Sequence, residues 1–94
     1  MEEALLPVNP VVLSACGLLG LDPLYVANEG KVLSCVDPSG VPAVLRAMKR
    51  NPLGRKAAVI GTVTRARAGV WLKTRAGGLR PLPMLEGDQL PRIC

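Results

Sequence analysis

The sequence contains no histidine and no phenylalanine, and its 94 residues include one tryptophan and one tyrosine. Without histidine, neither a Ser-His nor a Cys-His nucleophile pair can form, and His-containing metal sites are excluded. The three cysteines include no Cys-x-x-Cys pair, so we expect no zinc or iron–sulfur site. No apolar run reaches the ~20 residues that span a bilayer, so we expect no contact with membranes.

The cysteine count and the first residues also bear on location. Three cysteines are an odd number, at spacings that suggest no disulfide framework, and this fits reduced thiols in a cytoplasm. The acidic start Met1-Glu2-Glu3 lacks the basic residues that open a secretory signal. We therefore expect a cytoplasmic protein of one small domain.

Acidic residues are missing from a long part of the chain. No Asp or Glu lies between Pro38 and Leu85, whereas ten of the twelve Lys and Arg residues lie between Arg46 and Arg80. Such a block could bind phosphate, RNA or an acidic protein, or it could be a solvated basic face. Nucleic-acid binding is disfavoured, because base stacking needs exposed aromatic side chains and the chain has almost none.

Two segments have the pattern of helices. Asn9 and Pro10 provide a cap and a first-turn proline before apolar residues at helical spacing, and Gly20 marks the end. Asp37 and Pro38 precede a second helix over roughly residues 40–50, with one apolar face and one basic face.

Extended segments make up most of the remainder. Proline at positions 81 and 83 confines the last of them to a sheet edge or to irregular structure. The expected fold class is α+β: a small, mainly antiparallel sheet with two main helices packed on one face, followed by a flexible C-terminal tail. The expected strands are residues 31–36, 57–64, 70–74 and 79–85.

Cys94 is the last residue and one candidate for chemistry. The adjacent terminal carboxylate opposes ionisation of its thiol, although Arg92 could partly offset this effect. The arrangement indicates a tethered thiol presented to another site; the alternative is a terminal cysteine without a role. Prenylation is excluded, since that signal places its cysteine four residues from the end. Cys16 and Cys35 occupy apolar positions and are expected in the core.

The turn Asn28-Glu29-Gly30 is the second candidate. Glu29 is the only carboxylate between Asp22 and Asp37, and loops at strand ends often carry binding or catalytic groups. The alternative is a simple solvated turn. No glycine-rich phosphate-binding motif occurs, so the chain has no recognisable nucleotide site.

Several motifs together resemble a known family. Residues 14–31 (SACGLLGLDPLYVANEGK) are similar to a signature of the C-terminal domain of the hydrogenase expression/formation protein HypE family, within the wider aminoimidazole-ribonucleotide-synthetase-like superfamily. Residues 51–55 (NPLGR) and 57–61 (AAVIG) resemble the next block. The ending QLPRIC, residues 89–94, resembles the terminal motif and is the most specific of these matches.

The resemblance implies a role in making the cyanide ligands of nickel–iron hydrogenase. In that family a carbamoyltransferase loads a carbamoyl group onto the terminal thiol, here Cys94. An ATP- and Mg-dependent step dehydrates the thiocarboxamide to a thiocyanate, and the cyano group passes to an iron-scaffold complex. By this resemblance Glu29 is the candidate base, Arg92 orients the tail, and Asn28 and Gly30 belong to the binding loop.

This sequence differs from the family in two ways, and both limit what the resemblance implies. Gly17 stands where family members usually have Glu. Family proteins are also several times longer, and their ATP-binding domain precedes this region.

We therefore expect a partial C-terminal domain over residues 1–86 and a mobile tail over residues 87–94. This part of a carbamoyl dehydratase is expected to be inactive alone and to hold no cofactor itself. The alternative is a small basic module that binds protein or RNA.

Overall fold

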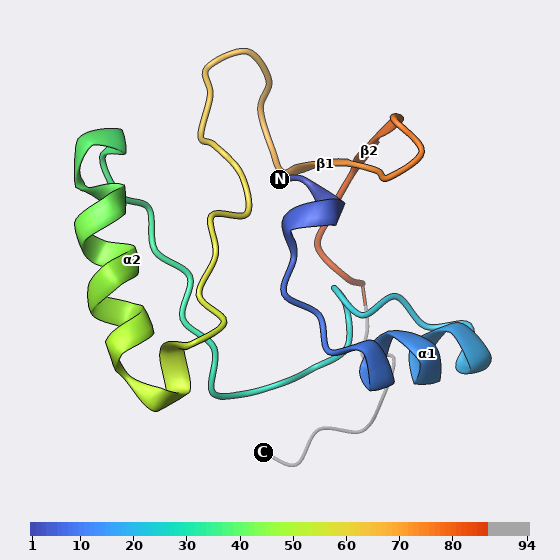
Figure 1. Ribbon diagram of the computed structural model, residues 1–94. Coiled ribbons are helices and arrows are strands. Elements are labelled where there is room, and N and C mark those ends of the chain that lie inside the picture. Colours follow the sequence, from blue (N-terminus) through green and yellow to red (C-terminus); the bar gives the residue numbers. More distant parts are fainter. Residues whose placement is uncertain (87–94) are drawn as a thin grey trace. The chain divides into compact units, whose positions relative to one another are not determined.

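A computed structural model describes residues 1–86 of the chain, and its element order is shown in Figure 1. Two compact units are present: Met1–Pro7 with Leu33–Leu82 form the first, and Val8–Val32 with the residues from Pro83 form the second. The elements are η1 (Glu3–Leu5), α1 (Pro10–Leu19), η2 (Pro38–Gly40), α2 (Val41–Arg50), η3 (Pro52–Gly54), β1 (Trp71–Lys73) and β2 (Leu79–Pro81).

Helix α1 belongs to the second unit and begins and ends where the sequence predicts. The Asn9 side chain accepts a hydrogen bond of 2.9 Å from the backbone N–H of Val11, with Pro10 in the first turn. Gly20 ends the helix in the left-handed region at φ 68°, and its N–H donates to the carbonyl of Cys16. Cys16 is the buried residue of this helix, at 5% exposure, as expected from the sequence.

Helix α2 belongs to the first unit and follows η2. Asp37 accepts a hydrogen bond of 2.9 Å from the backbone N–H of Ser39 and another of 2.5 Å from its hydroxyl. These two bonds lower the pKa of the Asp37 carboxyl, the hydroxyl having the larger effect. The predicted amphipathic pattern is confirmed: the half-buried residues are Val41, Val44, Leu45 and Met48, and the exposed basic ones are Arg46, Lys49 and Arg50.

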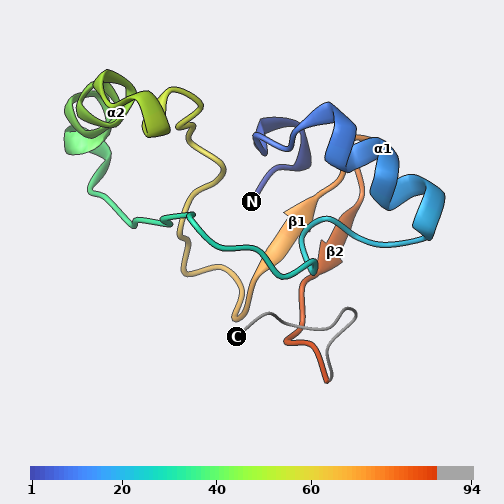
Figure 2. The same ribbon diagram turned by 90° about the horizontal axis from the view of Figure 1, so that it is seen from below.

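The sheet of the first unit is the antiparallel pair β1–β2, with Leu72 opposite Arg80. Figure 2 shows the two strands side by side. Leu72 is 1% exposed and forms the buried centre of this unit. The first residues of the chain lie along the other edge of β1, where Glu2 and Lys73 form a parallel bridge and the Met1 amine donates to the carbonyl of Trp71 at 2.8 Å.

The α+β class and the antiparallel sheet are confirmed, but two predicted strands are wrong. Residues 31–36 and 57–64 have no regular secondary structure. Apolar, β-branched composition favours a strand only where a neighbour exchanges backbone hydrogen bonds with it, and neither segment has such a ladder within residues 1–86. Strand β2 ends at Pro81, which is shorter than the predicted 79–85, as the prolines at 81 and 83 explain.

The two helices lie in different compact units, so the contacts of each are described separately. The main contacts of α2 with other elements are with η2 and η3, which flank it in sequence. Helix α1 lies in the other unit, so packing of both helices on one sheet face stays a prediction. The predicted tail, residues 87–94, lies outside the described residues, and the proposed division at residue 86 also stays a prediction. Neither helix found within residues 1–86 is long and apolar enough to cross a bilayer.

Candidate functional site

The chain that follows α1 is shaped by a local turn at Asp22. The Asp22 side chain accepts a hydrogen bond of 3.0 Å from the backbone N–H of Leu24, and its carbonyl accepts one of 2.9 Å from Tyr25. Aspartate before proline favours such a turn, since its short side chain reaches the backbone two residues later. This turn precedes the Asn28–Gly30 loop along the chain.

Residues Asn28, Glu29 and Gly30 form an exposed loop. The Asn28 amide donates a hydrogen bond of 3.0 Å to the carbonyl of Val26. Gly30 has φ 73°, a left-handed conformation that side chains disfavour, and no atom lies within 4 Å of the position that its Cβ would take. Gly30 therefore suits the left-handed backbone of this loop, and the space on the Cβ side of Gly30 is open.

The Glu29 carboxylate is exposed, and within residues 1–86 it makes no hydrogen bond or ion pair. An exposed carboxylate that no neighbour engages is chemically able to accept a proton from a group that comes from outside these residues. The described part of the chain therefore presents a possible base without a preformed pocket around it.

Tyr25 is a residue of this region that the sequence analysis did not single out. Its hydroxyl donates a hydrogen bond of 3.1 Å to the carbonyl of Pro83, 58 residues later. The bond joins the chain just before the Asn28–Gly30 loop to the segment that leads towards the C-terminus. The only sequence signal was that Tyr25 is the single tyrosine, inside the 14–31 motif.

Of the other candidates, Cys94 and Arg92 lie outside the described residues. The expectation that Cys35 belongs to a core is wrong: its thiol is free and exposed, because the strand that would have buried it does not form. Gly17 has nothing within 4 Å of the position of a Cβ, so there is open space for the first atom of the Glu usual in the family.

Metal or nucleotide binding has no visible support among these residues. Residues 1–86 hold no group of three Cys, Asp or Glu side chains that could bind a metal ion. The glycines supply none of the glycine-rich phosphate-binding motifs, and whether the chain itself holds a cofactor stays a prediction.

Comparison with known proteins identifies the class of this domain. Residues 3–73 match the family described as "AIR synthase related protein, C-terminal domain", and the chain belongs to this family. The match includes α1, the Asn28–Gly30 loop, α2 and β1.

Particular relatives narrow the class further. The chain is 54% identical over 95 aligned residues to carbamoyl dehydratase HypE of Bradyrhizobium diazoefficiens and 50% identical to that of Cupriavidus necator; each alignment covers all of this chain and 27% of the relative. A crystal structure of E. coli HypE, a hydrogenase maturation protein, is similar at TM-score 0.89 and 45% identity, over 99% of this chain and 29% of that one. The resemblance to the HypE C-terminal domain is thus confirmed, and the chain spans about a quarter of its curated relatives.

Proposed function

We propose that this chain is the acceptor-bearing part of a nickel–iron hydrogenase maturation enzyme and that Cys94 carries the carbamoyl group. The observation behind the proposal is the 54% identity to a carbamoyl dehydratase over an alignment that covers all of this chain. That relationship, together with the terminal QLPRIC motif, favours a working thiol over a cysteine without a role.

The first step requires only the thiol and an activated carbamoyl donor. The sulfur of Cys94 attacks the carbamoyl carbon held by a partner carbamoyltransferase, an S–C bond forms, the bond to the donor's leaving group breaks, and the thiol proton passes to solvent. The partner carbamoyltransferase supplies the base through which the thiol proton reaches solvent. Arg92 orients the tail.

The second step removes water from the thiocarboxamide and leaves a thiocyanate. Activation of the departing oxygen by ATP belongs to the part of the enzyme that lies beyond this chain. The amide nitrogen loses two protons in this step, one when the oxygen is activated and one as the activated oxygen leaves. The contribution of this chain is an acceptor for the second proton: Glu29 takes it, and Asn28 and Gly30 hold the loop in place. The cyano group then passes to an iron-scaffold complex.

Exposed apolar side chains support the need for further protein. Leu18 is 90% exposed, Leu33 77% and Leu53 98%, and the chain spans only 27% of relatives that carry the full activity in their names. Isolated exposed leucines are common, but so many large ones on a chain of this size mark surfaces that other protein covers. We propose that the ATP-binding part of the enzyme covers them and that this chain alone is inactive. A cytoplasmic location would keep the acceptor thiol reduced.

Mass spectrometry of the intact protein tests the acceptor role. The chain is incubated with the matching carbamoyltransferase, carbamoyl phosphate and ATP, and a mass gain equal to HNCO that maps to Cys94 is expected. Cys94→Ala should abolish this gain. Cys35→Ala is the matched control, because Cys35 is an exposed thiol that should not be loaded. Loading that persists in Cys94→Ala, or no loading of the folded chain, would contradict the proposal.

A further inference from the structure

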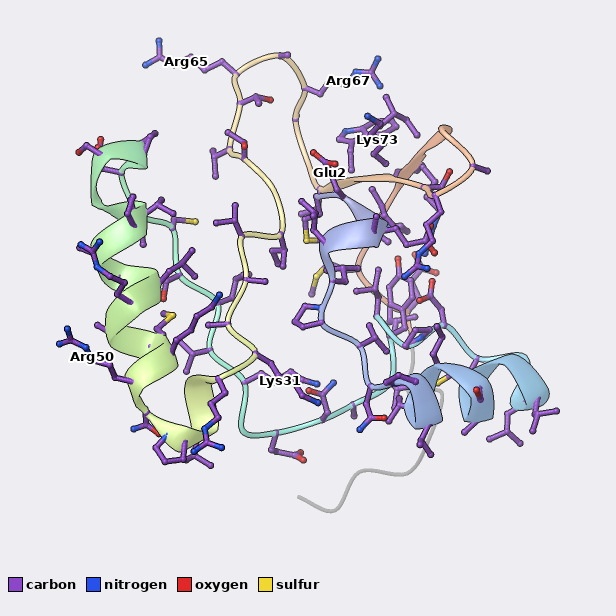
Figure 3. The ribbon with its side chains drawn as sticks, in the orientation of Figure 1. Glu2, Lys31, Arg50, Arg65, Arg67 and Lys73 are labelled. Carbon is purple, nitrogen blue, oxygen red and sulfur yellow. The ribbon has the colours of Figure 1, made fainter. Side chains whose placement is uncertain are left out.

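Five exposed basic side chains follow one another on α2 and just beyond η3. We call them the α2 basic surface; they are Arg46, Lys49, Arg50, Arg55 and Lys56. Arg46 and Arg50 are one helical turn apart and share a face, with Lys49 beside them. Figure 3 shows the Arg50 side chain extending away from the helix.

The end of α2 and the start of the next segment are held together closely. The backbone N–H of Asn51 donates to the carbonyl of Met48 at 3.1 Å, and the Asn51 side chain accepts from Leu53 at 2.9 Å. Gly54 packs against the Met48 carbonyl so tightly that a Cβ there would overlap its oxygen and lie 2.8 Å from its carbon. This turn places Arg55 and Lys56 next to the C-terminal end of the helix, so the five charges belong to one local structure.

The charges of the α2 basic surface are not balanced within the described residues. None of the five side chains makes a hydrogen bond or an ion pair with any part of residues 1–86. The nearest acidic residue before them, Asp37, precedes the opposite end of α2. The helix dipole favours Lys49 and Arg50 in the last turn, but it does not account for Arg46. Like charges one turn apart destabilise a helix, so this arrangement has a cost that a partner could offset.

A second group of basic residues in the same unit lies near Trp71 and the first residues of the chain. The Arg67 guanidinium lies over the Trp71 ring, 5.0 Å from its centroid. The backbones of Glu2 and Lys73 form a parallel β-bridge, and Figure 3 shows the two residues beside each other. The Glu3 carboxylate accepts a hydrogen bond of 2.8 Å from the backbone of Arg75. The second group is Arg65, Arg67, Lys73 and Arg75: within it the Arg67 side chain is engaged by an aromatic ring, and the backbones of Lys73 and Arg75 contact the acidic residues Glu2 and Glu3.

We propose that the α2 basic surface is a docking site for an acidic surface of a partner protein. Opposite charges at an interface raise the association rate and select the partner, and exposed, uncompensated cations on a helix suit that role. A nucleic acid fits less well, since binding of single strands relies on exposed aromatic side chains. Trp71 is half-buried and already engaged by Arg67. The docking site is independent of Cys94 and extends beyond the proposed carbamoyl chemistry.

Matched charge removal tests the proposal. One variant combines Lys49→Gln, Arg50→Gln, Arg55→Gln and Lys56→Gln; the control combines Arg65→Gln, Arg67→Gln, Lys73→Gln and Arg75→Gln, so both lose four positive charges. The probes are a fluorescein-labelled peptide of alternating Glu and Asp and a labelled uridine oligonucleotide, followed by anisotropy. We expect peptide affinity to fall about tenfold or more in the first variant, and less than about twofold in the control.

Cross-linking of the unsubstituted chain provides a second readout that does not depend on the folding of any variant. A carbodiimide joins lysine amines to carboxylates in contact, and the four lysines of the chain are Lys31, Lys49, Lys56 and Lys73. We expect peptide cross-links mainly at Lys49 and Lys56. Equal loss of affinity in the two variants, cross-links mainly at Lys31 or Lys73, or tighter binding of the oligonucleotide than of the peptide would overturn the proposal.

Discussion

The Tyr25 hydroxyl donates a hydrogen bond of 3.1 Å to the Pro83 carbonyl and thereby connects residues far apart in sequence. Tyr25 lies just before the Asn28–Gly30 loop, and Pro83 lies on the way to the C-terminal residues that include Cys94. The bond therefore joins the segment just before the candidate base Glu29 to Pro83.

Tyr25→Phe should weaken this connection without removing apolar contacts. Loss of one hydrogen bond between exposed groups is expected to lower the free energy of unfolding by about 0.5–1 kcal/mol, and hydrogen exchange of the backbone at residues 26–29 should accelerate. Urea denaturation and exchange measured by mass spectrometry check the two effects. Unchanged exchange at residues 26–29 would show that the bond does not restrain the loop.

Glu29→Gln should separate the two proposed chemical steps. Loading of Cys94 needs no base from Glu29 and should stay normal, whereas dehydration by the complete enzyme should slow by about 10²–10⁴-fold if Glu29 accepts the amide proton. Quenched-flow mass spectrometry distinguishes the thiocarboxamide from the thiocyanate. Glu86→Gln, which neutralises another exposed carboxylate, serves as control and should leave both steps unchanged. Normal dehydration in Glu29→Gln would remove this role.

Two glycine substitutions should have opposite effects on stability. Gly54→Ala places a Cβ against the Met48 carbonyl and should lower the free energy of unfolding by about 1–3 kcal/mol, as overpacking does. Gly17→Ala adds a methyl group in open space within α1 and should raise it by up to about 1 kcal/mol, because alanine favours helix. Chemical denaturation measures both. Equal effects would show that the tight turn after α2 is not present in solution.

The pH dependence of the turn before α2 follows from Asp37. The Ser39 hydroxyl and backbone N–H lower the pKa of this carboxyl below its ordinary value of 3.8. Its stabilising effect is therefore fully present above the ordinary value and is lost as the pH falls through the lowered one. NMR titration of the carboxyl should show a higher pKa in Ser39→Ala, which keeps only the backbone bond. An identical pKa in Ser39→Ala would contradict the assignment of the hydroxyl as the larger cause.

The helices and the sheet differ in how far the sequence predicted them. Both helices were anticipated because their determinants are local: Asn9, Pro10 and Gly20 act within a few residues of α1, and Asp37 acts next to α2. Strands depend on partners distant in sequence. For that reason residues 31–36 and 57–64 were predicted as strands and are not, and Cys35 was expected in a core and is exposed.

By itself the sequence determined the α+β class, the helix boundaries, the basic composition and the resemblance to the HypE family, because each depends on short motifs or on residue counts. Only the tertiary structure decided that Tyr25 reaches Pro83, and that Glu29 and the α2 basic surface make no hydrogen bond or ion pair within residues 1–86. Those relationships join residues far apart along the chain, and sequence patterns carry no information on which distant groups come within hydrogen-bond or ionic distance.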